Sequence, residues 1–172
     1  MELDELGYLP TYDGCYVCGQ EHPRGLRARF FVQQQGQVHV RFTPDATQTG
    51  YDDVVHGGVV AALMDELLGW VIVKHTERMC FTAEITVRFL KILTVGHVYV
   101  GNAGPCVDQG RYWESKGRLC NEEGEVHAKA LGKYFLLSEE HTRKVVNRMT
   151  GQPEDLPVLR RMNPSGEEYD GR

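Results

Sequence analysis

The chain has 172 residues, which is enough for one domain with a core of its own. It carries 19 Lys and Arg against 24 Asp and Glu, and this net charge of −5 argues against a nucleic-acid partner. The hydrophobic share of 41% and the charged share of 25% are ordinary for a globular protein and exclude a disordered or fibrous chain. The residues from 1 to 6 lack a secretion signal, and no apolar stretch reaches the roughly 20 residues of a membrane span. We therefore expect a cytoplasmic protein that binds neither membranes nor nucleic acids.

Residues 1–25 carry scattered Gly and Pro and are expected to form an irregular leader that covers part of the domain. The leader contains the pair Cys15 and Cys18, separated by two residues. A structural zinc site needs four ligands. The sequence has no second pair of cysteines with this spacing, and His22 is the nearest additional residue that could bind zinc. An odd total of five cysteines favours reduced thiols over a disulfide framework. We expect no metal and no cofactor.

The domain proper is expected over residues 26–137. Two β-rich runs at 26–32 and 37–42 are separated by a Gln-rich and Gly-containing connection, and a loop over 43–53 follows. Four further strands are expected over 79–93, 96–104, 111–121 and 125–137. Polar and apolar residues alternate over 83–89, which is typical of a strand with one buried face. A capped helix is expected over 138–150, followed by a flexible tail over 151–172.

Between the two groups of strands lies one long apolar run. From Val59 to Val73 the charged residues are Asp65 and Glu66, so a helix here is apolar on nearly all sides and largely buried. A buried carboxylate is costly unless it is paired, and perturbed acids of this kind gather at functional sites. The pattern therefore predicts an α+β fold in which an antiparallel sheet wraps around one central helix that carries functional acids.

These residues resemble the hotdog-fold acyl-CoA thioesterase superfamily, and specifically the group similar to phenylacetic-acid-pathway (PaaI-like) thioesterases. The resemblance spans residues 14–137 and is carried by His56-Gly57-Gly58, by Asp65, and by the strand at 82–91 with Val95-Gly96. The leader around Cys15 and Cys18 is also similar to that of one bacterial branch of these proteins.

The resemblance implies a catalytic site. The amide matching Gly57 polarises the thioester carbonyl as an oxyanion donor at the positive end of the helix dipole. Asp65 is the catalytic carboxylate, acting either as general base or as nucleophile. Thr82 matches a Ser or Thr that supports the acid or the water, and His56 orients the loop or contacts substrate. Many relatives carry Asn or Gln where this chain has Gly50, so Gln48, Asp52 or Thr82 takes over water positioning, or catalysis proceeds through an anhydride.

Substrate contacts are expected from the same stretch of chain. Gly58 allows close approach of the substrate, Phe89 and Lys91 are candidates for pantetheine contacts, and Arg88 is a candidate for the phosphates of coenzyme A. Trp70, Leu67 and Leu68 are candidates for an acyl pocket or for plain core packing. The acyl group itself is left open between aryl and medium-chain types.

Helix geometry predicts an oligomer. At 1.5 Å per residue, Gly57 and Asp65 lie about 12 Å apart along the axis, and the angle between His56 and Asp65 places them on opposite sides of the helix. One thioester carbon therefore cannot contact both groups of one chain, and an antiparallel partner helix would complete the site. We expect a homodimer with two composite sites, paired into a tetramer in many family members. A non-catalytic acyl-CoA-binding protein and a hotdog enoyl-CoA hydratase or dehydratase remain as alternatives.

Overall fold

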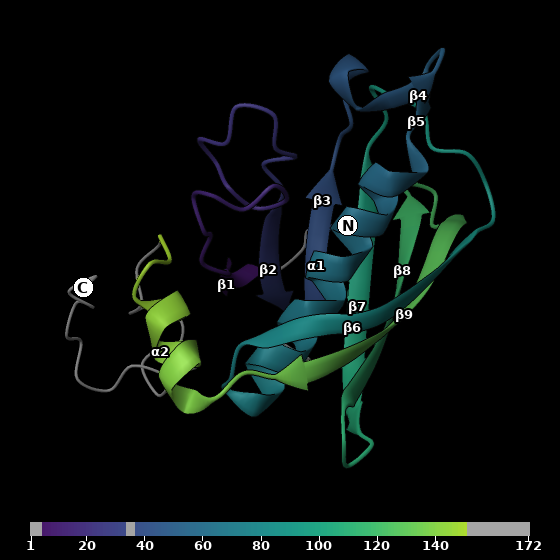
Figure 1. Cartoon of the computed structure of the whole chain (residues 1–172). Helices are drawn as coiled ribbons and strands as arrows, with labels where there is room; N and C mark the ends of the chain where they lie inside the picture. Colours follow the sequence, from purple (N-terminus) through teal and green to yellow (C-terminus); the bar gives the residue numbers. More distant parts are fainter. Residues whose placement is uncertain (1–4, 34–36, 151–172) are drawn as a thin grey trace.

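The computed structural model describes residues 5–33 and 37–150. Within these residues one antiparallel sheet has the strand order β1-β2-β3-β7-β8-β9-β6. The strands are β1 (Glu5–Tyr8), β2 (Arg29–Gln33), β3 (Val38–Phe42), β6 (Cys80–Phe89), β7 (Tyr99–Asp108), β8 (Trp113–Asn121) and β9 (Val126–Leu136). Figure 1 shows this sheet curving around the helix α1 (Gly57–Thr76), so that β6 crosses the viewer's side of the helix. The predicted hotdog arrangement is confirmed.

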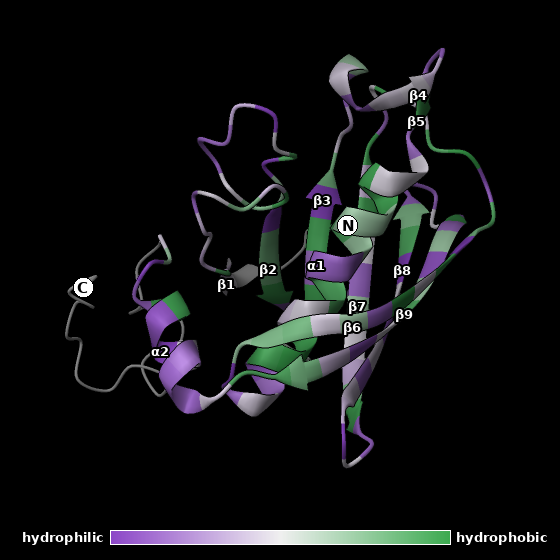
Figure 2. Ribbon diagram, in the orientation of Figure 1, coloured by the Kyte–Doolittle hydropathy of each residue, from purple (hydrophilic) through white to green (hydrophobic). Residues whose placement is uncertain are grey.

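The helix α1 is buried as its sequence predicts. Leu63, Met64, Leu67, Leu68 and Ile72 are each 0% exposed, so the core is built around this helix. In Figure 2 a hydrophilic turn interrupts its largely apolar surface near the middle. The helix ends where Glu77 adopts the left-handed conformation at φ 57° and donates its N–H to the Val73 carbonyl.

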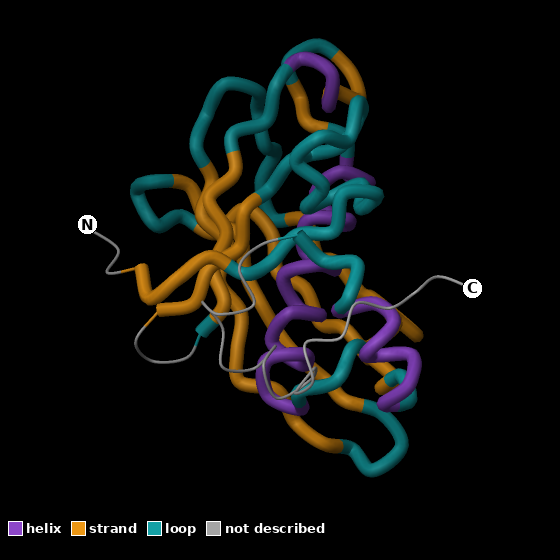
Figure 3. The backbone as a smooth tube through the Cα atoms, turned by 90° about the vertical axis from the view of Figure 1, so that its left-hand side faces the viewer, coloured by secondary structure: helices purple, strands orange, loops and turns teal. Residues whose placement is uncertain are grey.

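Glycines of the sheet allow α1 to lie directly against the strands. A Cβ at Gly101 on β7 would be 3.0 Å from Leu67, and one at Gly117 on β8 would be 3.0 Å from Leu68. The Ser115 hydroxyl donates a hydrogen bond of 3.0 Å to the Leu68 carbonyl at the same contact. Figure 3, turned by 90° from Figure 1, shows most of the strands on one side of α1. The helix is therefore fixed tightly enough to orient its acids.

Several short elements were not expected from the sequence. β1 lies within the segment expected to be irregular, and the expected loop at 43–53 contains the 3-10 helix η1 (Ala46–Gln48) and β4 (Thr49–Tyr51). β4 pairs with β5 (Val54–Val55) to form a two-stranded sheet of its own. These pairings are only two to four residues long, too short to leave a periodic signal.

The C-terminal helix α2 (Glu139–Val146) begins at a Ser138 cap, as predicted. Val146 is buried in the main core, and Thr11 forms an antiparallel bridge with Thr150. α2 and the leader therefore lie on the same side of α1, as Figure 1 also shows. Among the described residues, no helix combines the length and the apolar character that crossing a membrane requires. The tail expected over 151–172 lies outside the described residues.

Candidate active site

Asp65 is held by two hydroxyl groups. Thr82 on β6 donates a hydrogen bond of 2.8 Å to Asp65 Oδ1, and the Tyr134 hydroxyl on β9 lies 3.1 Å from the same oxygen. The Tyr134 hydroxyl is also 3.1 Å from the backbone carbonyl of Asp65. Burial, with the nearby charge of Asp65 as a further cause, raises the pKa of Tyr134, so this hydroxyl keeps its proton and acts as a donor. The carboxylate is thereby oriented from two strands.

Tyr134 contacts Asp65 although it was not among the candidate site residues expected from the sequence. Its ring is 1% exposed and lies over Gly132 of the same strand, where any Cβ would collide with it. On α1, a Cβ at Gly69 would lie 3.7 Å from the same ring. Glycines at 69 and 132 thus make the space that lets the Tyr134 hydroxyl reach Asp65. Because side chains alternate between the two faces of a strand, Gly132 and Tyr134 lie on the same face of β9. This spacing was the one feature of the sequence that indicated room for the Tyr134 ring.

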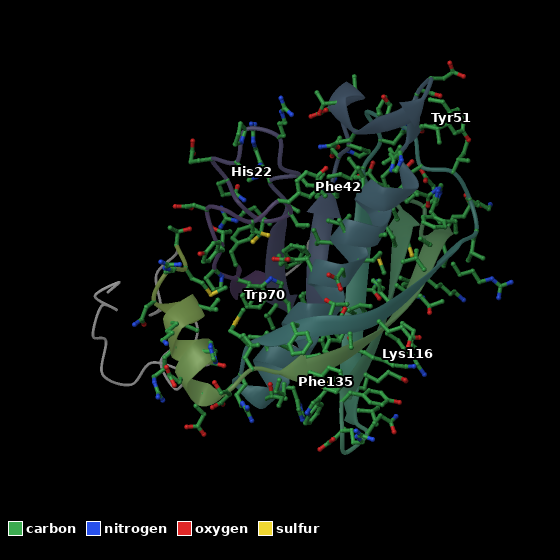
Figure 4. All side chains as sticks on the ribbon, viewed as in Figure 1. His22, Phe42, Tyr51, Trp70, Lys116 and Phe135 are labelled. Atoms are coloured by element: carbon green, nitrogen blue, oxygen red, sulfur yellow. The ribbon has the colours of Figure 1, made fainter. Side chains whose placement is uncertain are left out.

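A cavity of about 560 Å³ opens beside Asp65, a volume in the usual range for small-molecule sites. It is bounded by α1, by the leader, by the start of β6 and by α2 with the residues that follow it. Its lining includes Thr82, Tyr134, Trp70, Val73, Met79 and Met149. Figure 4 shows Trp70 on the side of α1 that faces α2. Of the acyl-pocket candidates, Trp70 lines this cavity, whereas Leu67 and Leu68 are core residues with 0% exposure.

His56 is the N-cap of α1 and does not pair with Asp65. Its Nδ1 accepts a hydrogen bond of 2.9 Å from the Gly58 N–H, so the side chain caps the first turn of the helix. The Gly58 amide is therefore occupied. The Gly57 N–H is the first donor of the helix and has no hydrogen-bond partner among the described residues. It points out of an exposed helix end, at the positive end of the dipole.

Gly57 lies in a second hollow of about 330 Å³. Two of the predicted substrate contacts, Phe89 and Lys91, line this hollow together with Tyr51, and a Cβ at Gly57 would be 3.4 Å from the Phe89 ring. In Figure 4 Tyr51 lies at the end of the molecule that carries β4. Lys91 forms an ion pair with the exposed Glu125. Among the described residues, Gly58 and Arg88 are not part of this lining.

The two halves of the predicted site are separate within one chain. Asp65 and Thr82 line the larger cavity, whereas Gly57, Phe89 and Lys91 line the other hollow. This separation agrees with the spacing of about 12 Å along the helix that the sequence predicts. Completion of the site by a second chain stays a prediction.

Position 50 carries no substitute for the missing Asn or Gln. A Cβ there would lie 3.4 Å from the Cα of His56, so Gly50 permits close packing against the cap. Gln48 is buried and its Oε1 accepts a hydrogen bond of 3.1 Å from the Asp45 N–H, which closes η1 in a capping box. Among the three candidates for the vacant role, Thr82 is the one hydrogen-bonded to Asp65.

Glu66, next to Asp65, faces the leader instead. Cys15 Sγ lies 3.7 Å from both carboxylate oxygens of Glu66. Burial, with the charge of Cys15 as a second cause, raises the pKa of Glu66 to about 7. Hydrogen bonds from Cys18 and from the Val17 N–H lower the pKa of Cys15. The hydrogen bond between the two thiols, together with burial, raises the pKa of Cys18. These three groups also line the larger cavity.

Comparison with known proteins supports the architecture. Residues 52–125 match the family model described as the thioesterase superfamily. A search of curated proteins gave no significant match. A crystal structure described as a thioesterase superfamily protein is similar over 72% of this chain, with a TM-score of 0.64 and 23% sequence identity. The match covers 60% of that longer chain.

Two further structures are informative. A hypothetical thioesterase from Streptococcus pneumoniae, solved with coenzyme A, has a TM-score of 0.54 and 25% identity, covering 59% of this chain and 81% of that one. The PaaI protein of E. coli, from the phenylacetic acid degradation operon, has a TM-score of 0.58 and 18% identity, covering 66% and 81%. At these identities the structural likeness establishes a shared fold. The chain therefore has the fold of these thioesterase structures, and its residues 52–125 are similar in sequence to the thioesterase superfamily.

Proposed function

We propose that this protein is an acyl-CoA thioesterase, which hydrolyses an acyl- or aryl-CoA thioester to the free acid and coenzyme A. The observation that carries the proposal is the arrangement around Asp65. The hydroxyl groups of Thr82 and Tyr134 both form hydrogen bonds with Asp65 Oδ1, whereas Asp65 Oδ2 has no hydrogen-bond partner within residues 5–33 and 37–150. The Asp65 side chain also lines a cavity that is large enough for an acyl group. A carboxylate with one fixed and one available oxygen suits a general base or a nucleophile.

The chemistry can follow either of two balanced routes. As a base, Asp65 takes a proton from water, the resulting hydroxide attacks the thioester carbon, and the carbon–sulfur bond breaks to release the thiolate of coenzyme A. As a nucleophile, an Asp65 oxygen attacks the carbon, the thiolate leaves, and water then hydrolyses the mixed anhydride. In both routes negative charge develops on the carbonyl oxygen, and the Gly57 N–H is the donor that would stabilise it.

Relatives support a coenzyme A substrate. The Streptococcus pneumoniae protein was solved with coenzyme A, and the protein BH2602 of Bacillus halodurans was solved with CoA. Variants of the former with an Asp or a Thr replaced by Ala have also been solved, and that Asp precedes that Thr as Asp65 precedes Thr82 here. Phe89, Lys91 and the hollow at Gly57 are candidates for the pantetheine arm, and the cavity at Asp65 is the candidate for the acyl group.

The proposed active form is a homodimer, with a dimer of dimers as a further step. β6 is an edge strand of ten residues, and an exposed edge of this length is a template for pairing with another chain. Large apolar side chains remain exposed along and just beyond β6, including Phe81 at 52% and Ile92 at 61%. Two-fold pairing of β6 strands would set the α1 helices antiparallel and bring Gly57 of one chain toward Asp65 of the other.

The proposal is tested by coenzyme A release from a panel of aryl, short, medium and long acyl-CoAs. We compare the wild type with Asp65→Asn and with Asp108→Asn as the matched control, because Asp108 accepts a turn hydrogen bond from the Gly110 N–H and lines neither of the two cavities. We expect turnover to fall by at least about 1000-fold in Asp65→Asn and to persist in the control. Saturable binding without turnover in the wild type would indicate an acyl-CoA-binding protein. Hydration of an enoyl-CoA without coenzyme A release would indicate a hydratase.

A further inference from the structure

Two leader cysteines and one helix carboxylate meet on the inner side of the leader. One ligand atom from each of Cys15, Cys18 and Glu66 lies within 4.8 Å of the other two. In a tetrahedral zinc site, bonds of about 2.3 Å to sulfur and about 2.1 Å to oxygen place the two ligand atoms about 3.6 Å apart. Cys15 Sγ lies 3.7 Å from the Glu66 oxygens, so the groups already have the spacing of shared ligands.

The backbone around Cys15 is folded to receive a thiolate. The N–H groups of Val17 and Cys18 both donate to Cys15 Sγ at 3.3 Å, which places two positive dipole ends on the sulfur. The turn closes when the Gly19 N–H donates a 3.0 Å hydrogen bond to the Cys15 carbonyl. A Cβ at position 19 would lie 2.6 Å from that carbonyl oxygen, so this turn requires Gly. The backbone of this turn therefore directs two N–H groups at the Cys15 sulfur.

Lys144 and Arg148 line the same cavity as this cluster, but within the described part of the chain no ion pair is recorded between a cationic side chain and Glu66. Glu66 and Cys15 are half-buried, Cys18 is 2% exposed, and the carboxylate of Asp65 is next in the chain. Several acidic groups gathered in a partly apolar setting are costly unless a cation compensates them.

We propose that Cys15, Cys18 and Glu66 bind a zinc-type divalent cation that ties the leader to the central helix. Two sulfur ligands select a soft or borderline ion over Mg²⁺ or Ca²⁺. The three groups line the cavity, so a fourth coordination position would be available to water from that side. The proposed site differs from the expectation of no metal drawn from the sequence, and its third ligand would be Glu66 rather than His22.

Such a site would have a structural consequence. Glu66 lies in the middle of α1, while Cys15 and Cys18 belong to a segment 51 and 48 residues earlier in the chain. A metal bound by all three would close this long loop and hold the leader over the cavity. Its removal is therefore expected to lower thermal stability and to loosen the leader while the sheet stays folded.

The test uses the full chain purified under reducing conditions, so that Cys15 and Cys18 cannot form a disulfide. Zinc content is measured by mass spectrometry of the digested protein, and Co²⁺ is added to chelator-treated protein as a spectroscopic probe. We expect about one zinc per chain and a cobalt spectrum with thiolate charge-transfer and tetrahedral bands. Cys15→Ser, Cys18→Ser and Glu66→Gln should each reduce zinc content to below about 0.1 per chain.

Cys106→Ser is the matched control, because Cys106 is a half-buried free thiol on β7 outside the cluster. The control should retain its zinc and its cobalt spectrum. The proposal is overturned if the reduced wild type takes up neither zinc nor cobalt through thiolates, a result that does not depend on how any variant folds. It is also overturned if folded Cys15→Ser and Glu66→Gln keep a full complement of zinc.

Discussion

Replacement of Gly57 by proline isolates the contribution of one backbone N–H to turnover. Proline lacks the amide hydrogen, and position 57 is the first residue of α1, where proline is well accepted because that N–H has no helical partner. The preceding residue, His56, has φ −61° and ψ 132°, an extended conformation that a following proline favours. The substitution should therefore remove the donor and leave the helix in place.

The expected loss follows from the proposed role of that donor. Removing one oxyanion-hole hydrogen bond typically costs about 2.7–4 kcal/mol of transition-state stabilisation, or roughly 100- to 1000-fold in kcat. Gly57→Ala is the matched control, since it keeps the N–H and adds a Cβ at the same place, 3.4 Å from the Phe89 ring. The assay is coenzyme A release at saturating substrate, with urea unfolding to verify that both variants are equally stable. A proline variant that turns over within threefold of the alanine variant would refute the assignment of Gly57.

Two further predictions concern other polar groups. Tyr134→Phe removes one of the two hydroxyl contacts to Asp65 Oδ1. Because a hydrogen bond to a charged group contributes about 1.5 kcal/mol or more, steady-state kinetics should show kcat lower by about tenfold at unchanged KM. An unchanged kcat would assign Tyr134 to packing alone. Burial lowers the pKa of His39, whose Nε2 has no hydrogen-bond partner among the described residues. The unfolded chain therefore protonates His39 more readily than the folded chain does, and stability is lost as the pH falls through about 6.5. His39→Phe should therefore flatten the difference between urea unfolding at pH 8 and pH 5, and an undiminished difference would contradict this cause.

The central part of the fold was predictable because its signals are local. The run from Val59 to Val73 is apolar on nearly every side, and a helix of that kind must be surrounded by other structure. The alternation over 83–89 likewise predicted a strand, and Ile85 and Val87 on its apolar face pack against the core. The predicted burial of that face is only partly correct, because Phe89 is 51% exposed. The family resemblance implied that Thr82 supports either the acid or the water, and a hydrogen bond of 2.8 Å from Thr82 to Asp65 is present.

What escaped prediction depends on tertiary contacts. Tyr134 reaches Asp65 across 69 residues of sequence, and the space for its ring is made by glycines on two different elements. Glu66 meets Cys15 from 51 residues away, so the local spacing of the two cysteines suggested only an incomplete metal site. No periodicity within a segment encodes such contacts, because they arise when the leader, α1 and β9 pack together.

In the proposed dimer, a thioester is cleaved between Gly57 of one chain and Asp65 of another. This arrangement is tested most directly by mixing two inactive variants, Asp65→Asn and Gly57→Pro, through co-expression or joint refolding, and measuring coenzyme A release. With random pairing, half of the dimers contain one of each chain, and each of these holds one intact site of two, so the mixture should recover about a quarter of wild-type activity if sites are shared. Activity no higher than that of the separate variants would contradict a site shared between two chains.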